Sequence, residues 1–262
     1  MDKNSFEALV DKKLITKVDL VDYYQSNPQA LEKLTMEELV KVGIATELSA
    51  NNYILPNFSE GGKFILSKDL HLTKPIIVEK DLEIDLNGHN IISDVMFVDE
   101  SDGSTNCYIF WVKSGKLVIK GDGEVKAISG AQYDMAVWAN GGSVEIHGGH
   151  FVSGGSEGDG GDCIYTSSKG TVDIYGGRFE CLNINSKSFA KPQYGVLNEK
   201  GNNQDTIHCY GGEYVNFNPS DNISENPKRD FCAEGYESVL IGSGVWKVQK
   251  KSEKDIVVEE QQ

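Results

Sequence analysis

The chain contains only two arginines, Arg178 and Arg229, and its 40 acidic residues outnumber its 25 basic ones, giving a net charge of −15 over 262 residues. A chain with this excess of negative charge is repelled by nucleic acid and by anionic membrane surfaces, so we expect neither as a partner. The sequence also lacks any run of about 18 apolar residues, so we expect no membrane insertion.

Cysteine pairs and prolines are scarce as well. The five cysteines are odd in number and no two have the spacing of zinc ligands, so we expect reduced, buried thiols, no metal site and no cofactor. Six prolines against 28 glycines favour tight turns over extended linkers. The N-terminal sequence lacks the apolar core of a signal peptide, so we expect synthesis in the cytoplasm without signal-peptide secretion.

Residues 1–50 have a helical pattern. Thr35 and Glu38 form a capping box, and Gly43 is a natural helix end. No helix predicted here exceeds about 11 residues, so each needs a packing partner. Two interpretations remain open: the segment caps the following domain, or it anchors the protein to a partner. The sequence therefore predicts a small α-helical N-terminal segment (1–50), a main domain (57–250) and a charged C-terminal tail (251–262).

The main domain repeats a short unit of alternating apolar residues. Each unit is centred on an anchor that is isoleucine in four copies and cysteine in the fifth. The anchors are Ile84, Ile119, Ile146, Ile174 and Cys209. The steps of 27, 28 and 35 residues between them indicate a stacked architecture with one coil per step.

The residues around the anchors predict three short strands in each coil. An apolar strand comes first, then a glycine turn, a Val-x-Ile strand, a Gly-Gly bend and a third strand that opens with Phe or Tyr. Alternation in Val-x-Ile places Val and Ile inside and the intervening residue outside. The pattern is typical of a mainly β protein built as a short right-handed parallel β-helix of about five coils.

The first and last parts of the repeat resemble known β-helix proteins. Residues 61–66 (GGKFIL), 69–72 (DLHL) and 82–91 (LEIDLNGHNI) resemble the opening module of pectate-lyase-like β-helix proteins. Residues 211–219 (GGEYVNFNP) and 231–236 (FCAEGY) resemble the closing coil of β-helix proteins from gut bacteriophages and prophages. The resemblance covers roughly residues 57–250. It implies a virion protein, such as a head fibre, capsid decoration or tail appendage, and a homotrimer.

Glu145 and Asp173 fall at the same outward position of adjacent predicted coils. Their carboxyl groups would lie about 5 Å apart, near the separation found in retaining glycosidases. His147, Tyr175 and Tyr210 would share this face and are candidates for glycan binding. The alternative interpretation is an ordinary solvated sheet face.

Asp134 and Asp162 each precede an apolar strand, and we expect them to align in adjacent coils as a second candidate acid pair. The run 153–162 (SGGSEGDGGD), with Glu157 and Asp159, is rich in the oxygen ligands that calcium prefers but lacks the spacing of a calcium repeat loop. A polar loop without metal is the simpler interpretation.

Trp111 and Trp138 occupy equivalent places in successive coils. We predict that they pack together at an interface between subunits, with stacking on a sugar as the alternative.

These observations favour a structural component of a bacteriophage particle. The predicted protein is a capsid-attached fibre or decoration located in the virion, held to a capsid or tail protein by residues 1–50. The alternative is a tail appendage that binds host surface glycans or cleaves them as a polysaccharide hydrolase or lyase. The basic proton acceptor and the calcium-binding acidic cluster of pectate lyases are not matched.

Overall fold

The computed structural model describes residues 58–99, 103–154, 161–182, 196–201, 205–222 and 229–252. All of these belong to the second of the two units into which the chain divides, Pro56–Gln262. The helices expected over 1–50, nearly all of the expected tail, and Glu157 and Asp159 lie outside the described residues. Within the described ranges the fold is mainly β, and the one helical element is the short 3-10 helix η1 (Phe58–Glu60).

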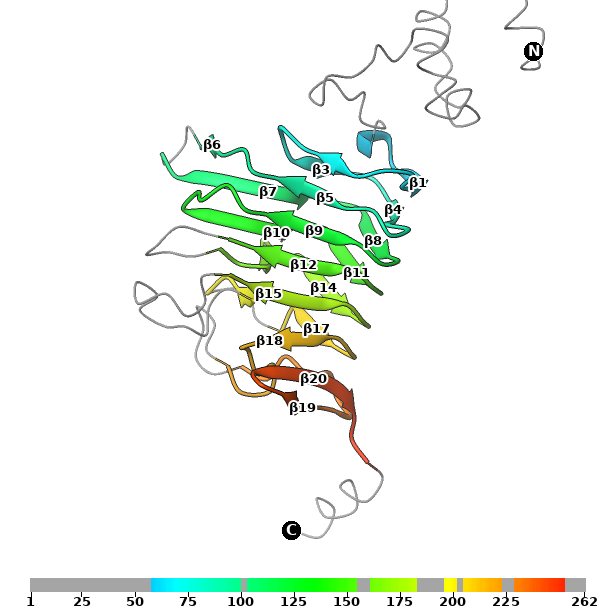
Figure 1. Ribbon diagram of the computed structural model, residues 1–262, viewed down its shortest axis with the longest axis vertical. Coiled ribbons are helices and arrows are strands. Elements are labelled where there is room, and N and C mark those ends of the chain that lie inside the picture. The colour runs from blue at the N-terminus through cyan, green and yellow to red at the C-terminus, as the bar shows by residue number, and fades with distance from the viewer. Residues whose placement is uncertain are drawn as a thin grey trace, which may run out of the picture. The chain divides into compact units, whose positions relative to one another are not determined.

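Three sheets, made mostly of parallel strands, build the fold (Figure 1). Sheet 1 contains β1 (Gly62–Ile65), β4 (Leu82–Asp85), β8 (Lys116–Lys120), β11 (Ser143–Ile146), β14 (Thr171–Ile174) and β17 (Ile207–Cys209). Sheet 2 contains β2 (Leu70–His71), β5 (Ile91–Ser93), β9 (Glu124–Ala127), β12 (His150–Ser153), β15 (Arg178–Cys181), β18 (Glu213–Val215), β20 (Val245–Lys250) and β19 (Tyr236–Gly242). Sheet 3 contains β3 (Ile76–Val78), β7 (Thr105–Val112), β10 (Tyr133–Asn140), β13 (Ile164–Ser167) and β16 (Leu197–Glu199), and β6 (Phe97–Val98) pairs with β7.

The chain contributes one strand to sheet 1, one to sheet 2 and one to sheet 3, and each such round of three strands lies beside the previous round. We call each round a circuit; the first is β1, β2 and β3, and the last contains β17 and β18. Sheet 1 has one strand more than the number of anchor residues in the repeat, which is five. In this additional strand, β1, Phe64 occupies the anchor position and is the register partner of Ile84. The three strands per circuit are those that the repeat predicts.

The anchor residues form a continuous ladder inside the stack. Ile84, Ile119, Ile146, Ile174 and Cys209 are register partners in sequence and are fully buried. A second ladder joins the aromatic rings of Phe151, Phe179 and Tyr214, whose centroids lie 5.2 and 5.1 Å apart. Burying a side chain of this size contributes roughly 1.5–3 kcal/mol, so both ladders stabilise the stack. The expectation that Cys209 is a core residue is confirmed.

The Gly-Gly bends turn the chain from sheet 1 into sheet 2. The second glycine of each pair has a positive φ, which is +95° at Gly149, +100° at Gly177 and +94° at Gly212. The first glycine is required for a different reason, because a Cβ at Gly211 would lie 2.2 Å from the carbonyl oxygen of Tyr175 in the preceding circuit. The predicted use of glycine at these corners is confirmed.

An antiparallel hairpin ends the stack. β20 pairs antiparallel with β18, and β19 pairs antiparallel with β20. The change of direction ends the parallel order of the preceding strands. Among the described residues there is no helix that could span a lipid bilayer.

Candidate functional site

Glu145 and Asp173 are register partners on β11 and β14, so their predicted alignment is confirmed. Each carboxylate has a different partner, which is a lysine for Glu145 and a histidine for Asp173. Lys116 Nζ lies 2.6 Å from Glu145 Oε1, and His147 Nε2 lies 3.5 Å from Glu145 Oε2. His208 Nδ1 lies 3.0 Å from Asp173 Oδ1. Partly exposed ion pairs of this kind each contribute less than about 1 kcal/mol.

The electrostatics of Glu145 do not suit a general acid. The hydrogen bond from Lys116 is the main cause that lowers the pKa of the Glu145 carboxyl below its ordinary value. A glycosidase acid needs the opposite, a raised pKa that keeps the carboxyl protonated near neutral pH. The lowered pKa of Glu145 therefore speaks against Glu145 as the acid of a catalytic pair.

The predicted alignment of Asp134 with Asp162 is wrong by one residue. Val137 and Ile164 are register partners. Asp134 lies three residues before Val137, whereas Asp162 lies only two residues before Ile164. Asp134 is fully buried and accepts hydrogen bonds from Ser129 Oγ (2.6 Å) and the Gly130 amide (3.0 Å). Asp162 instead accepts one from Asn198 Nδ2 at 3.1 Å. The two do not form an acid pair, because a shift of one residue sends side chains to opposite faces.

His147, Tyr175 and Tyr210 form an exposed aromatic ladder, as the sequence predicts. Adjacent ring centroids are 4.9 Å apart in both steps, with interplanar angles of 9° and 11°. Tyr236 closes the ladder with its ring at 87° to that of Tyr210. Both faces of the Tyr175 ring are therefore covered by its neighbours. The ladder offers ring edges and hydroxyl groups to a ligand, rather than a ring face on which a sugar could stack.

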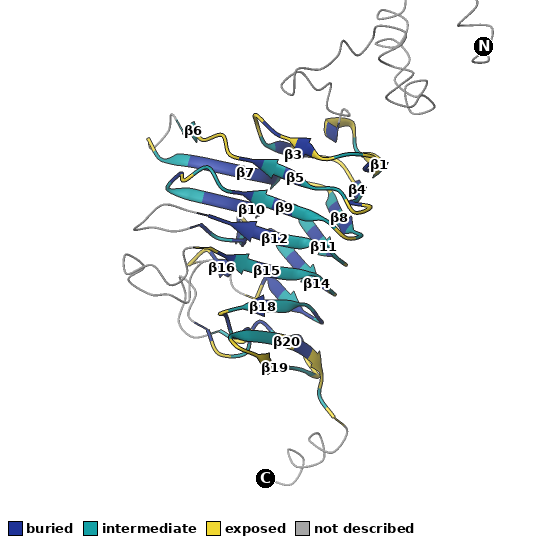
Figure 2. Ribbon diagram, in the orientation of Figure 1, coloured by how far each residue is buried: buried dark blue, intermediate teal, exposed yellow. Residues whose placement is uncertain are grey.

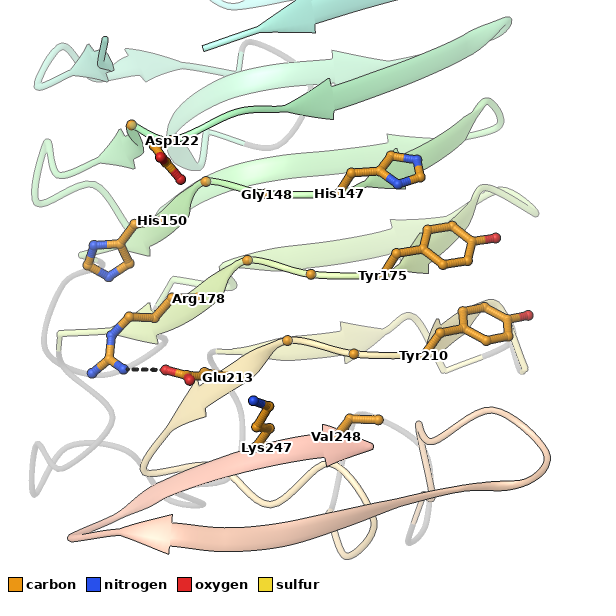
Figure 3. A pocket seen from close by; sticks show the side chains of 16 residues that line it. Asp122, His147, Gly148, His150, Tyr175, Arg178, Tyr210, Glu213, Lys247 and Val248 are labelled. Carbon is orange, nitrogen blue, oxygen red and sulfur yellow. Dashed lines mark hydrogen bonds and ion pairs between the residues drawn. The ribbon is translucent and has the colours of Figure 1, made fainter. Parts of the chain in front are cut away.

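This ladder is one wall of an open groove of about 770 Å³ (Figure 3). The floor is made of the three Gly-Gly pairs, which have no side chains; Gly211 is buried and the other five glycines are half-buried. The second wall carries His150, Arg178 and Glu213, and Lys247 of β20 lies at the C-terminal end. These second-wall residues are absent from the sequence-based candidates. The signal was present, because His150, Arg178 and Glu213 each follow a Gly-Gly pair directly.

Most charges on the second wall are already paired. Arg178 Nη1 binds Glu213 Oε2 at 3.2 Å. His150 lies between two carboxylates, with Glu124 Oε1 3.3 Å from Nδ1 and Glu180 Oε2 3.4 Å from Nε2. These contacts join neighbouring circuits, so the wall also ties the stack together.

Trp111 and Trp138 are register partners, and their indole rings are parallel within 2° at 5.1 Å. Tyr108 packs edge-on against Trp138, and Phe97 of β6 packs against Tyr108. Most residues of β7 and β10 are buried (Figure 2). The predicted packing of the two tryptophans on one another is confirmed, and their parallel rings cover one face of each other.

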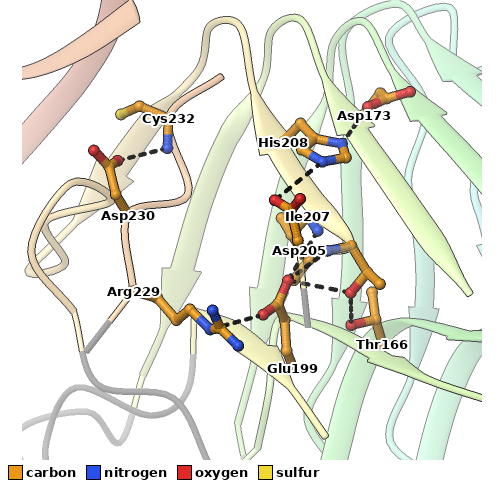
Figure 4. Close-up of polar contacts among 10 residues, drawn as sticks. Thr166, Asp173, Glu199, Asp205, Ile207, His208, Arg229, Asp230 and Cys232 are labelled. Atoms are coloured by element: carbon orange, nitrogen blue, oxygen red, sulfur yellow. Dashed lines mark hydrogen bonds and ion pairs between the residues drawn. The ribbon is translucent and has the colours of Figure 1, made fainter. Parts of the chain in front are cut away.

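A buried polar cluster closes sheet 3 at its C-terminal end (Figure 4). Glu199 Oε1 accepts hydrogen bonds from the backbone amides of Thr206 (2.7 Å) and Ile207 (3.1 Å). Its other oxygen lies 3.2 Å from Arg229 Nε. The repeat does not reveal this pair, because Arg229 is 30 residues away and no repeat position marks it. The ion pair links the two segments, whereas Arg229 Nη2 is buried without a hydrogen-bond partner among the described residues.

Among the residues that the structure describes, no group of three or more His, Cys, Asp or Glu side chains is arranged to hold a metal ion. Comparisons of the chain with protein-family models, with curated proteins and with solved structures find no match in any of the three.

Proposed function

We propose that the chain is a right-handed parallel β-helix that serves as a structural component of a bacteriophage particle. In this proposal it is a fibre or decoration of the capsid, held to a capsid or tail protein through residues 1–50. The resemblance of its opening and closing motifs to phage β-helix proteins supports the particle assignment. The three-strand circuits with buried ladders support the β-helix.

The observation that best supports a structural role is the set of exposed apolar side chains on the outer face of sheet 3. Beside the Trp111–Trp138 stack, Ile77 is the register partner of Trp111 and is 39% exposed. Met96 and Val98, in the segment that includes β6, are also exposed. A cluster of exposed apolar residues beside aromatic rings is typical of a surface that binds another protein. We propose that this face joins copies of the chain into a homotrimer.

Light scattering on the full-length protein tests the assembly. The expected mass is three times that of one chain, and Ile77→Lys should lower it by placing a charge in the interface. Ile65→Lys, at a 71% exposed position on sheet 1, is the matched control and should leave the mass unchanged. A monomeric wild-type protein would contradict the trimer.

The particle assignment has its own test. Mass spectrometry of purified particles from the host that carries the gene should detect the chain at a stoichiometry comparable to that of other minor structural proteins. Complete absence of the chain from such particles would contradict the proposal.

A second candidate function is binding of host surface glycans without cleavage. The groove with its Tyr175 and Tyr210 hydroxyls favours it, and the ion-paired, deprotonated Glu145 disfavours cleavage. Saturable binding to host surface material should weaken in Tyr175→Ala, while sugar release by the wild-type protein should be undetectable. Cleavage that is lost in Glu145→Gln would instead establish an enzyme.

A further inference from the structure

Cys232 continues the buried anchor ladder beyond Cys209. The two cysteines are register partners in an isolated parallel bridge. Two backbone hydrogen bonds hold this register: the Cys209 amide donates to the Phe231 carbonyl at 2.7 Å, and the Ala233 amide donates to the Cys209 carbonyl at 3.0 Å. Register partners on parallel segments place their side chains on the same face, so the two thiols are neighbours in the ladder.

The spacing of the two cysteines suits a disulfide bond. Neighbouring strands lie about 4.8 Å apart. This separation falls within the range of about 4.4–6.8 Å that disulfides require between Cα atoms. Among the described strand pairs, no other cysteine faces a cysteine, because Cys107 is the register partner of Asp134 and Cys181 is that of Ser153.

Cys232 is the more accessible member of the pair. Cys209 is fully buried, whereas Cys232 is half-buried. Ser220 Oγ lies 3.2 Å from Cys232 Sγ, and the Cys232 amide donates to Asp230 Oδ1 at 2.9 Å (Figure 4). Burial raises the pKa of the Cys232 thiol to about 11 and also raises that of Cys209. A reagent in solution therefore meets Cys232 first and reacts slowly, because little of this thiol is deprotonated.

We propose that Cys209 and Cys232 form a reversible disulfide bond when the folded protein meets a small-molecule disulfide such as oxidised glutathione. This inference is independent of the particle assignment and of glycan binding. Cysteine pairs stay reduced in a reducing cytoplasm and become oxidised outside it. The new bond joins the closing segment of the chain to β17 and so locks the C-terminal end of the stack.

The reaction proceeds by two exchanges at sulfur. The Cys232 thiol loses its proton to solvent, and its thiolate attacks one sulfur of the glutathione disulfide. This step forms a mixed disulfide on Cys232 and releases the first glutathione as a thiolate. The Cys209 thiolate then attacks the Cys232 sulfur and displaces the second glutathione. Overall the protein loses two hydrogen atoms with their electrons, and one glutathione disulfide becomes two glutathione thiols.

The cross-link should stabilise the folded chain. Cys232 lies 23 residues after Cys209, so the bond closes a loop that is open in the reduced unfolded chain. Closing such a loop lowers the conformational entropy of the unfolded state. The melting temperature should therefore rise by about 5–10 °C on oxidation and return to its original value after reduction with dithiothreitol.

Mass spectrometry of the full-length protein tests the proposal. The reduced protein is incubated in its folded state with oxidised glutathione at pH 8 for about one day, a time that allows for slow exchange. The free thiols are then blocked by alkylation under denaturing conditions. We expect a loss of mass equal to two hydrogen atoms before alkylation, three alkylated cysteines after it, and one cross-linked peptide pair that contains Cys209 and Cys232.

Three variants separate this pair from the other thiols. Cys232→Ser and Cys209→Val should each abolish the cross-link, and Val suits a ladder that is otherwise made of isoleucine. Cys107→Ala removes a buried thiol outside the pair and is the control, so it should still form the cross-link. Thermal unfolding of each reduced variant checks that it is folded.

Every other outcome would overturn the proposal. A glutathione adduct that persists on Cys232 would show that the Cys209 sulfur is out of reach. A cross-link that maps to another pair, or one that survives in Cys232→Ser, would assign the reactive thiols elsewhere. Five free thiols after the full incubation would show that the folded pair does not oxidise. A lower melting temperature in the oxidised protein would mean that the bond strains the end of the stack rather than locking it.

Discussion

The carboxylate of Glu199, which is 1% exposed, forms an ion pair with Arg229, 30 residues further along the chain. The pair ties the segment after residue 228 to the last strand of sheet 3. The other arginine, Arg178, forms its ion pair with Glu213 at the groove surface, where both side chains are more than one third exposed. The two arginines thus provide a matched comparison of a buried and an exposed ion pair.

Glu199→Gln should lower the free energy of unfolding by about 2 kcal/mol, because it leaves a guanidinium that is mostly buried without its counter-charge. Arg178→Met should cost less than about 1 kcal/mol, since solvent screens the exposed pair. Urea unfolding followed by circular dichroism measures both. Equal costs for the two variants would show that burial does not set the strength of the Glu199–Arg229 pair.

Gly211→Ala should destabilise the protein by about 2 kcal/mol or more, because the new Cβ would meet the Tyr175 carbonyl at 2.2 Å and force neighbouring circuits apart. Gly242→Ala is the control, since no atom lies within 4 Å of its added Cβ and its φ is ordinary. This control should change the free energy of unfolding by less than about 0.5 kcal/mol. A well-tolerated Gly211→Ala would mean that the spacing of circuits is more adjustable than the structure indicates.

Glu83 should make the stability depend on pH in the acid range. Hydrogen bonds from Lys120 and then Lys63 lower the pKa of its carboxyl to about 2. A lowered pKa stabilises the folded state above the pKa of the unfolded chain, and this contribution is lost as the pH falls toward 2. The melting temperature of the wild-type protein should therefore fall more steeply from pH 5 to pH 2 than that of Glu83→Gln. Glu234→Gln, at an exposed position, should follow the wild-type curve.

Native thiols should react slowly with a disulfide reagent at pH 8. Burial raises the pKa values of Cys107, Cys163 and Cys209, and raises that of the half-buried Cys232 to about 11, so little thiolate forms. Unfolding in urea should release all five thiols per chain for rapid reaction. Any slow native labelling should map to Cys232 by mass spectrometry. Fast native labelling of Cys163 would show that the stack opens readily.

The faces of the strands and the order of the circuit can be read from the sequence alone. Alternation around Val144 and Ile146 decides which side chains point inward, and the recurring Gly-Gly pairs mark the bend. These features are local and repeat, so they are readable without knowing which circuits are neighbours. The stacking of Trp111 on Trp138 and the alignment of Glu145 with Asp173 followed from the same period.

The partners of the charged groups depend on how the circuits pack in three dimensions. Lys116 reaches Glu145 from the preceding circuit, and Arg178 takes Glu213 from the following one, which leaves Lys247 unpaired. The offset between Asp134 and Asp162 arises because the loops before β10 and β13 differ in length, a difference that the period does not record. The antiparallel hairpin and Arg229 likewise carry no repeat signal. Periodicity determines which face a residue occupies, whereas loop length and packing determine what it meets there.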